Sequence, residues 1–183
     1  MKATNELKNE HQGVKLMLRV LRKLSAKAER GEYLAQEHLD GILEFLTVFV
    51  DTCHHGKEEE FLFPALETAG LQKKEELIGA LLEEHEQGRL LVSDLRKASA
   101  SLQKDPGDAG SFCSAANEYA MLLTKHIDKE DNELFPWAET MLSEDTDTKL
   151  FDSFEKLERE RIGAGKHEAF HELLEDLERE YLS

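Results

Sequence analysis

The chain has 183 residues, of which 40 % are hydrophobic and 34 % are charged, so it can bury one sizeable core beneath solvated amphipathic helices. Its formal net charge of -16 would repel phosphate backbones, which argues against nucleic-acid binding. The cysteines, Cys53 and Cys113, form no disulfide framework, and the N-terminus lacks the apolar core of a signal peptide, so we expect a cytoplasmic location. The longest apolar run, Phe45 to Val50, is too short to span a membrane.

Apolar residues recur every three, four or seven positions, and proline is scarce, so the sequence predicts an all-α protein. The first helix should begin at Thr4 or Asn5, either of which is a plausible N-cap, and should end near residue 30. His11 lies within its apolar stripe. A second helix is predicted over residues 35–68, with a kink or break just before Pro64, because proline cannot continue the hydrogen-bond ladder.

A third helix is predicted over residues 73–103, with His85 on its inward face. The segment 104–110 is the clearest loop in the chain. A fourth helix should follow over residues 111–142, and Pro136 repeats the situation of the proline in the second helix. The apolar residues that mark the inward face of the third helix are Ile78, Leu81, Leu82 and Val92.

Long helices joined by short loops favour an up-down-up-down four-helix bundle, which we assign to residues 1–143. The remaining residues, 144–183, are predicted to form a C-terminal helical extension. It should contain helices near 146–161 and 166–181, separated by a break at 163–165. The last helix has an apolar face, so we expect the extension to dock on the bundle.

One motif, H-x-x-K-E-x-x-x-L-F-P, occurs at residues 54–64 and again at 126–136. Within each copy a glutamate follows the histidine by four residues, which places both side chains on one helix face. Imidazole and carboxylate donors together suit iron or manganese better than copper or structural zinc. The pairs formed in this way are His54 with Glu58 and His126 with Glu130.

The other two predicted helices each contribute one inward histidine, so all four helices carry donors toward the interior. Buried carboxylates and imidazoles on apolar stripes would be unfavourable without a compensating cation. Inward ligands from every helix are typical of metal sites in bundles. The sequence therefore predicts a metal site made of His11, His54, Glu58, His85, His126 and Glu130.

The order H…HxxxE…H…HxxxE resembles the hemerythrin-like, or HHE cation-binding, family over roughly residues 5–142. The resemblance implies a non-heme di-iron centre with carboxylate bridges, in which manganese or zinc can replace the two iron ions. It also implies binding of O2 or a related ligand. The oxygen-carrying members have a histidine where this chain has Arg89, and an aspartate five residues after the last histidine, where this chain has Glu130 at four. These departures argue against simple reversible O2 carriage.

Two other histidines are candidates for an additional ligand. His55 follows His54 directly, and it is either a ligand or donor at the edge of the site or a partly buried interfacial histidine. His167 faces inward on the last helix and would present its ring to iron if that helix capped the open end of the bundle. The alternative, which we prefer, is a docking helix with a satisfied histidine. His38 is expected at the surface, and the runs Glu59-Glu60 and Glu83-Glu84 are expected to be solvated faces.

The function expected first is binding or sensing of O2 or a related small ligand such as NO at the di-iron centre. The alternative is a di-iron enzyme that acts in peroxide or NO detoxification or in iron–sulfur cluster repair, and iron storage is a third interpretation. Whether the protein is an enzyme stays open at this point. No catalytic side chain is predicted, because the chemistry would take place at the metals.

Overall fold

The structure is a computed structural model that describes residues 1–70, 75–105, 107, 109–163 and 165–182. Every regular element in these ranges is helical, so the predicted all-α class is confirmed for this part of the chain. None of the helices formed by the described residues combines the length and apolarity needed to cross a membrane.

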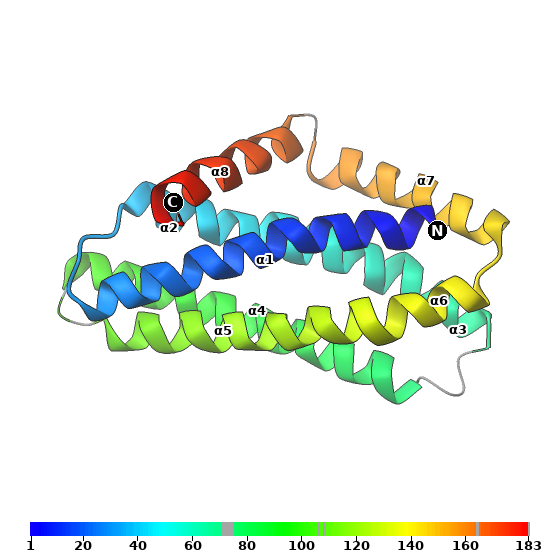
Figure 1. The fold of residues 1–183 in the computed structure, drawn as a ribbon, viewed down its shortest axis with the longest axis horizontal. Coiled ribbons are helices and arrows are strands. Elements are labelled where there is room, and N and C mark those ends of the chain that lie inside the picture. Colours follow the sequence, from blue (N-terminus) through cyan, green and yellow to red (C-terminus); the bar gives the residue numbers. More distant parts are fainter. Residues whose placement is uncertain (71–74, 106, 108, 164, 183) are drawn as a thin grey trace.

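The helices follow one another with short connections, and two stretches change helix type without a break in the path of the chain (Figure 1). The elements are α1 (Lys2–Glu29), α2 (Gln36–Glu44), the π-helical segments η1 (Phe45–His55) and η2 (Glu58–Leu62), α3 (Phe63–Thr68), α4 (Glu75–Lys104), α5 (Gly110–Lys129), the π-helical segment η3 (Glu130–Leu134), α6 (Phe135–Met141), α7 (Glu144–Arg161) and α8 (Lys166–Tyr181). Part of the predicted loop over 104–110 and the first two residues of the predicted third helix lie outside the described residues.

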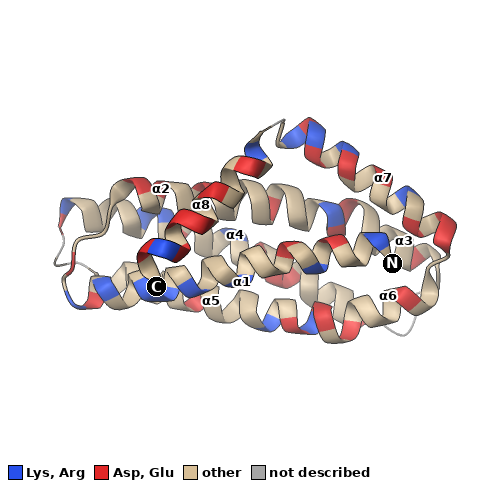
Figure 2. Ribbon diagram, turned by 45° about the horizontal axis from the view of Figure 1, so that its top comes forward, with Lys and Arg blue, Asp and Glu red and all other residues tan. Residues whose placement is uncertain are grey.

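The long elements run lengthwise beside one another. α5 contacts both α1 and α4, and α4 also contacts α2 and η1. The last two helices, α7 and α8, lie on one side of this arrangement, where they contact α1 and η1 (Figure 1). Charged residues, most of them acidic, lie along α7 and α8, as expected for helices with one solvated face (Figure 2).

The buried apolar side chains form two clusters. One contains residues of α1 after His11 together with Phe45, Leu46, Phe49 and Val50 of η1, which precede His54. The other contains Ala3 and Leu7, which precede His11, together with residues of α3, α6 and α7. A layer of buried histidines and glutamates therefore lies between two apolar clusters, where the local dielectric is low and charged groups interact strongly.

The predicted disruption before each proline takes the form of π-helical turns. Pro64 lies at the start of α3, directly after η2, and Pro136 lies at the start of α6, directly after η3. Proline has no N–H and clashes with the carbonyl group four residues earlier. In a π-helix the hydrogen bonds span five residues, so the wider turn accommodates the ring without ending the helix.

The N-terminus of α1 differs from the prediction. The helix begins at Lys2, and neither Thr4 nor Asn5 caps it. Instead, the backbone N–H groups of Lys2 and Ala3 donate to the carboxylate of Asp147 at 2.8 and 3.0 Å. A helix leaves its first N–H groups without partners and carries a partial positive charge there, so α7 supplies both the acceptor and the compensating negative charge.

Two other side chains lie where the sequence did not place them. His38, expected at the surface, is half-buried, and its Nδ1 is 2.5 Å from the hydroxyl oxygen of Tyr181. The docking of α8 against α2 covers it. Leu82, expected on the inward face of the third helix, is 38 % exposed, because it lies at the edge of the face of α4 that Ile78, Leu81 and His85 bury.

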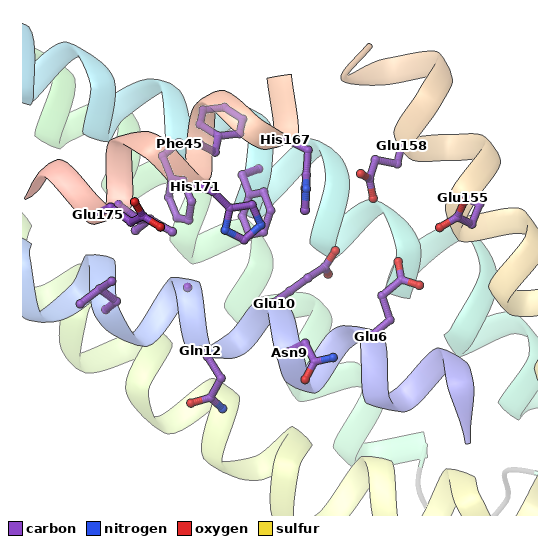
Figure 3. A pocket seen from close by; sticks show the side chains of 15 residues that line it. Glu6, Asn9, Glu10, Gln12, Phe45, Glu155, Glu158, His167, His171 and Glu175 are labelled. Carbon is purple, nitrogen blue, oxygen red and sulfur yellow. The ribbon is translucent and has the colours of Figure 1, made fainter. Parts of the chain in front are cut away.

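α8 buries Phe170, Leu174 and Leu177. Between this helix, α1, η1 and α7 lies a pocket of about 680 Å³. Its floor is aromatic and aliphatic, and its polar wall includes Glu6, Glu10, Glu158, His167 and His171 (Figure 3). We call this cavity the acidic pocket.

Candidate metal centre

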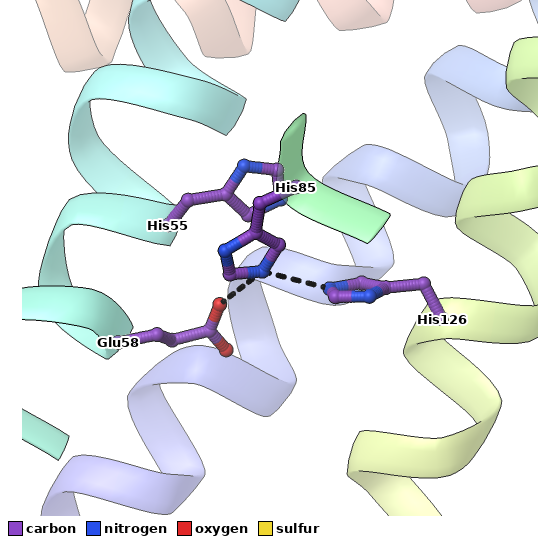
Figure 4. Close-up of side chains that lie close together, drawn as sticks. All are labelled: His55, Glu58, His85 and His126. Atoms are coloured by element: carbon purple, nitrogen blue, oxygen red, sulfur yellow. Dashed lines mark hydrogen bonds and ion pairs between the residues drawn. The ribbon is translucent and has the colours of Figure 1, made fainter. Parts of the chain in front are cut away.

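Histidines and glutamates from four stretches of helix meet in the buried polar layer. They form two adjoining groups, within each of which one donor atom per residue lies within 4.8 Å of the others. Every member is at most 3 % exposed. The His11 cluster contains His11, His54, Glu58 and Glu130, and the His85 cluster contains His55, Glu58, His85 and His126 (Figure 4).

The imidazole nitrogens converge in pairs. The Nε2 atoms of His11 and His54 are 3.1 Å apart, and those of His85 and His126 are 3.2 Å apart. Two neutral imidazoles would direct lone pairs at each other in this arrangement unless a proton or a metal ion lay between them. Each pair therefore offers two nitrogen donors toward a common point.

Both glutamates extend between the two imidazole pairs. One oxygen of Glu58 lies 3.6 Å from Nε2 of His54, and the other lies 3.5 Å from Nε2 of His85. Glu130 repeats the pattern, with one oxygen 3.2 Å from His11 and the other 3.3 Å from His126. Each carboxylate thus presents one oxygen to either side, which is the arrangement of a group that bridges two cations.

These carboxylates are buried, and among the described residues only the imidazoles of the two clusters lie within ion-pair distance of them. Glu58 and Glu130 are 0 % exposed, and none of their oxygens accepts a hydrogen bond from the described residues. Both ring nitrogens of His55 are also without hydrogen bonds there. Buried polar groups are rarely left unpaired, because desolvation alone costs several kcal/mol for a charged group. The donor set fits metal cations, which would pair with all of these atoms at once.

The electrostatics of the layer also favour a cation. Burial lowers the pKa of His126, but Glu130 and Glu84 outweigh that effect and raise it to about 10. Burial likewise raises the pKa of Glu130, whereas His126 and His11 bring it well below its usual range. The protein therefore surrounds these positions with enough negative charge to hold positive charge on the imidazoles, and a metal ion can replace that charge.

The outward nitrogen of each converging histidine donates to a carboxylate at 2.7–3.0 Å. Such a bond fixes the ring orientation, places the proton of the neutral ring on Nδ1 so that Nε2 can bind a metal, and raises the basicity of that nitrogen. The pairs are His11 Nδ1 with Asp131, His54 Nδ1 with Glu10, His85 Nδ1 with Glu59, and His126 Nδ1 with Glu84.

The sequence-based expectation for two of these carboxylates was wrong. Glu59 and Glu84 belong to the runs expected to be solvated faces, yet they position His85 and His126. A signal for them exists in the repeat. A glutamate directly precedes both single histidines, and an acidic residue directly follows both motif glutamates. Because each carboxylate bonds a histidine on another helix, the pairing becomes visible only when the helices are placed together.

The lysine of the repeated motif also has a role in this network. Lys57 is 0 % exposed, and its Nζ lies 2.6 Å from Glu10, 2.5 Å from Glu6 and 3.2 Å from Glu158. In the second copy, Lys129 pairs with Glu84. Each lysine therefore holds the carboxylate that orients the histidine of its own motif. The copies differ because α7 covers Lys57 and leaves its counterpart partly exposed.

His55 breaks the symmetry of the repeat, because Ile127 is the equivalent residue in the second copy. The ring of His55 stacks on that of His85, with centroids 3.9 Å apart. Burial, reinforced by His85 and His126, lowers its pKa well below the usual value, so the ring is neutral and keeps a lone pair. η1 ends here, and consecutive side chains in a wide π turn point in more similar directions, which brings His55 inward beside His54.

His167 belongs to neither cluster. Its ring lies 5.9 Å from that of Phe49 and 4.7 Å from that of His171, on the wall of the acidic pocket. The interpretation that α8 caps the open end of the helices and presents His167 to the metal site is therefore not supported. α8 instead packs lengthwise on α1 and η1, because its apolar face meets theirs along the side.

Arg89, one turn beyond His85, pairs with Asp51 at 2.7 Å and with Glu59 at 2.6 Å. It therefore stabilises the carboxylate that orients His85, and it donates no electron pair itself. Tyr119 is buried in the larger apolar cluster.

Comparison with known proteins agrees with this geometry. A family model described as the hemerythrin HHE cation-binding domain matches residues 2–138. Uncharacterized proteins of Mycobacterium tuberculosis and Mycobacterium bovis are 23 % identical over 178 residues, which cover 97 % of this chain and 69 % of each relative. No solved structure gives a significant match. The family match spans all residues of both clusters.

Proposed function

Because the chain belongs to the hemerythrin HHE cation-binding family, we propose that it is a non-heme di-iron protein that binds O2 or a related small ligand such as NO. Membership implies binding of metal cations, and the two histidine and glutamate clusters fit such a site. Two iron ions, their small ligand and a hemerythrin-like four-helix bundle over residues 1–143 are part of the proposal, as is the C-terminal extension over 144–183.

The observation that carries the proposal is the placement of the two carboxylates. Glu58 and Glu130 each present one oxygen to the His11 side and one to the His85 side, and the described protein offers neither a hydrogen bond. A single cation would pair with the carboxylate oxygens on only one side. Two cations, one in each cluster, would pair with the oxygens on both sides. The shared negative charge of the two carboxylates would offset the repulsion between the ions.

The two positions would differ in the number of protein donors. His11 and His54 would hold one ion together with the bridging carboxylates, and His55, His85 and His126 would hold the other. The ion on the His11 side would therefore have the more open coordination. When bound, ferrous ions supply the vacant coordination positions and the electrons that O2, NO or peroxide require. The protein's part is to orient the imidazoles and to exclude water with the flanking apolar clusters.

Metal analysis of variants tests the ligand assignment. We expect His54→Ala and His126→Ala to lower the iron content well below that of the wild type. His38→Ala is the control, because His38 lies in neither cluster and bonds Tyr181 instead. Circular dichroism shows whether each variant remains folded. Full iron stoichiometry in both folded ligand variants would refute the assignment.

Stopped-flow absorption of the anaerobically reduced, iron-loaded protein tests the function. We expect a stable adduct on mixing with O2 or NO. Sustained turnover of peroxide or NO without a stable adduct would favour the enzymatic alternative. Slow, irreversible autoxidation with no adduct to either gas and no turnover would exclude both, and iron holding would become the better interpretation.

A further inference from the structure

α8 presents two imidazoles to the acidic pocket. His167 and His171 are four residues apart, so they lie on one face of the helix, and their ring centroids are 4.7 Å apart. Among the described residues neither ring has a hydrogen bond or ion pair. Both point into the pocket, toward Glu10 on α1 and Glu158 on α7 (Figure 3). Two free imidazoles one turn apart are a ready pair of nitrogen donors for a transition-metal ion.

The pocket around these imidazoles carries an excess of negative charge. Glu6, Glu10 and Glu158 share the single ammonium group of Lys57. Glu155 and Glu175 also line the pocket, and neither has an ion pair with a described residue. A concave surface of one sign, with a low-dielectric wall behind it, concentrates counter-ions. The pocket therefore attracts cations to the two imidazoles.

The pocket also adjoins the metal centre. Glu10 lines its inner wall and accepts a hydrogen bond from His54 Nδ1 at 2.8 Å, while His54 Nε2 faces the His11 cluster. One glutamate thus lies between the cavity and a ligand of the centre. Glu10 therefore connects the acidic pocket to the His11 cluster through one hydrogen bond.

We propose that His167 and His171 form a docking site for a divalent transition-metal ion, Fe2+ in the working protein, which supplies the metal centre through the acidic pocket. The supply role rests on the di-iron function proposed above. Among the described residues no third donor converges on the two imidazoles within the spacing found in the buried clusters. The docked ion would complete its shell with water and exchange quickly, which suits delivery and not permanent retention.

A titration of the protein with its centre already filled tests for the docking site. Zn2+ is the probe, and the bound zinc is counted by equilibrium dialysis. We expect the wild type to take up one additional ion and the variant His167→Ala/His171→Ala to lose that uptake. Glu168→Ala/Glu172→Ala is the matched control, since both glutamates lie on the exposed side of the same helix. No additional ion in the wild type, or equal uptake by the histidine variant, would overturn the proposal.

Loading of the metal-free protein tests the supply role. Limiting Fe2+ is added anaerobically, and the rate at which the centre fills is measured by rapid chelator quenching. We expect the histidine variant to load severalfold more slowly, with unchanged final stoichiometry, because it keeps the acidic residues of the pocket but lacks the two donors that hold the ion beside the centre. Equal rates would overturn the supply role. Failure of the wild type to hold iron in the centre would instead refute the di-iron function, and the difference in zinc uptake between the wild type and the histidine variant would still report on the docking site.

Discussion

Each converging histidine directs Nε2 into a cluster and donates from Nδ1 to a carboxylate. Each of these carboxylates is in turn paired with a lysine or arginine side chain. His126 Nδ1 donates to Glu84, and Glu84 pairs with Lys129. We predict that Glu84→Gln lowers the affinity of the centre for metal by about 10–100-fold. The amide still accepts the hydrogen bond, but it no longer supplies the negative charge that makes the imidazole a stronger donor.

Glu83→Gln is the control for this prediction. Glu83 is the exposed neighbour of Glu84, and its substitution removes the same charge from the same helix. Competition with a chelator of known affinity measures the change. Equal losses in the two variants would mean that net charge, and not the bond to His126, is responsible.

Lys57 and Lys129 occupy equivalent places in the repeat but different environments. Removing the ammonium of Lys57 would leave three carboxylates facing one another in a buried site, so Lys57→Met should destabilise the metal-free protein by about 3–5 kcal/mol. Lys129 is 32 % exposed, so Lys129→Met should lower the free energy of unfolding by about 1 kcal/mol or less.

Urea unfolding of both variants, without metal, gives the two free energies of unfolding. The comparison controls for the residue type, for the motif and for the single charge removed. If both variants lost a similar free energy of unfolding, the burial of Lys57 beneath α7 would not strengthen its ion pairs.

At this scale the sequence predicted the residues that meet in the centre, because a fixed spacing on one helix determines which side chains share a face. It could not predict Glu59 or Glu84, since their partners lie on other helices and the same residues suit a solvated face. It left His55 undecided for a related reason. Whether it faces inward depends on the π-helical turn of η1, which no residue spacing reveals.

At the level of elements, the predicted helices agree with the structure to within a few residues, and α8 agrees at both ends. Amphipathic periodicity specifies long helices well. The π-helical segments were not predicted, although the position of each proline was informative. A proline shows that the α-helical ladder must change, but whether the chain kinks, stops or widens depends on what packs around it.

The start of α1 is stabilised from outside the helix. Asp147 accepts from two backbone N–H groups of α1 and is only 8 % exposed. We predict that Asp147→Ala lowers the free energy of unfolding by about 1–2 kcal/mol, because the donors lose their acceptor and the helix terminus loses a compensating charge. Asp145→Ala, on the exposed side of α7, should change stability by less than about 0.5 kcal/mol.

Denaturant unfolding compares these two variants under identical metal loading. The difference matters for the centre as well, because Asp147 ties α7 to the helix that carries His11. If Asp147→Ala were as stable as the wild type, the contact between α7 and α1 would have to be maintained by apolar packing alone.

For the whole molecule, the sequence predicted that an apolar face on the last helix would dock, but not where. Phe170, Leu174 and Leu177 mark a face suited to any apolar surface of the right length. The side along α1 and η1 is favoured in the structure because Phe45 and Phe49 are presented there, edge-on to Phe170. Tertiary matching of this kind depends on two surfaces at once, so one helix pattern cannot determine it.

The burial of the two glutamates determines how the stability of the whole molecule depends on metal. The two apolar clusters enclose a layer in which Glu58 and Glu130 accept no hydrogen bond from the described residues, so the metal-free fold retains a desolvation penalty that the neighbouring imidazoles offset only in part and that bound cations would remove. Ions that bind only the native state stabilise it by about 4 kcal/mol per site at a thousandfold excess over Kd. For a chain of this size, 4 kcal/mol corresponds to roughly 8–16 °C in Tm.

We therefore predict that chelation lowers Tm by at least about 8 °C and that reloading with Fe2+ restores it, as measured by anaerobic differential scanning calorimetry. The control is Glu58→Gln/Glu130→Gln, which removes both bridging charges while keeping the size of the side chains. Its Tm should not respond to chelator, because the ions would no longer be held. A wild type whose Tm is equally indifferent to chelator would show that the buried carboxylates are compensated within the protein, and the structural reason for assigning two cations to this layer would be lost.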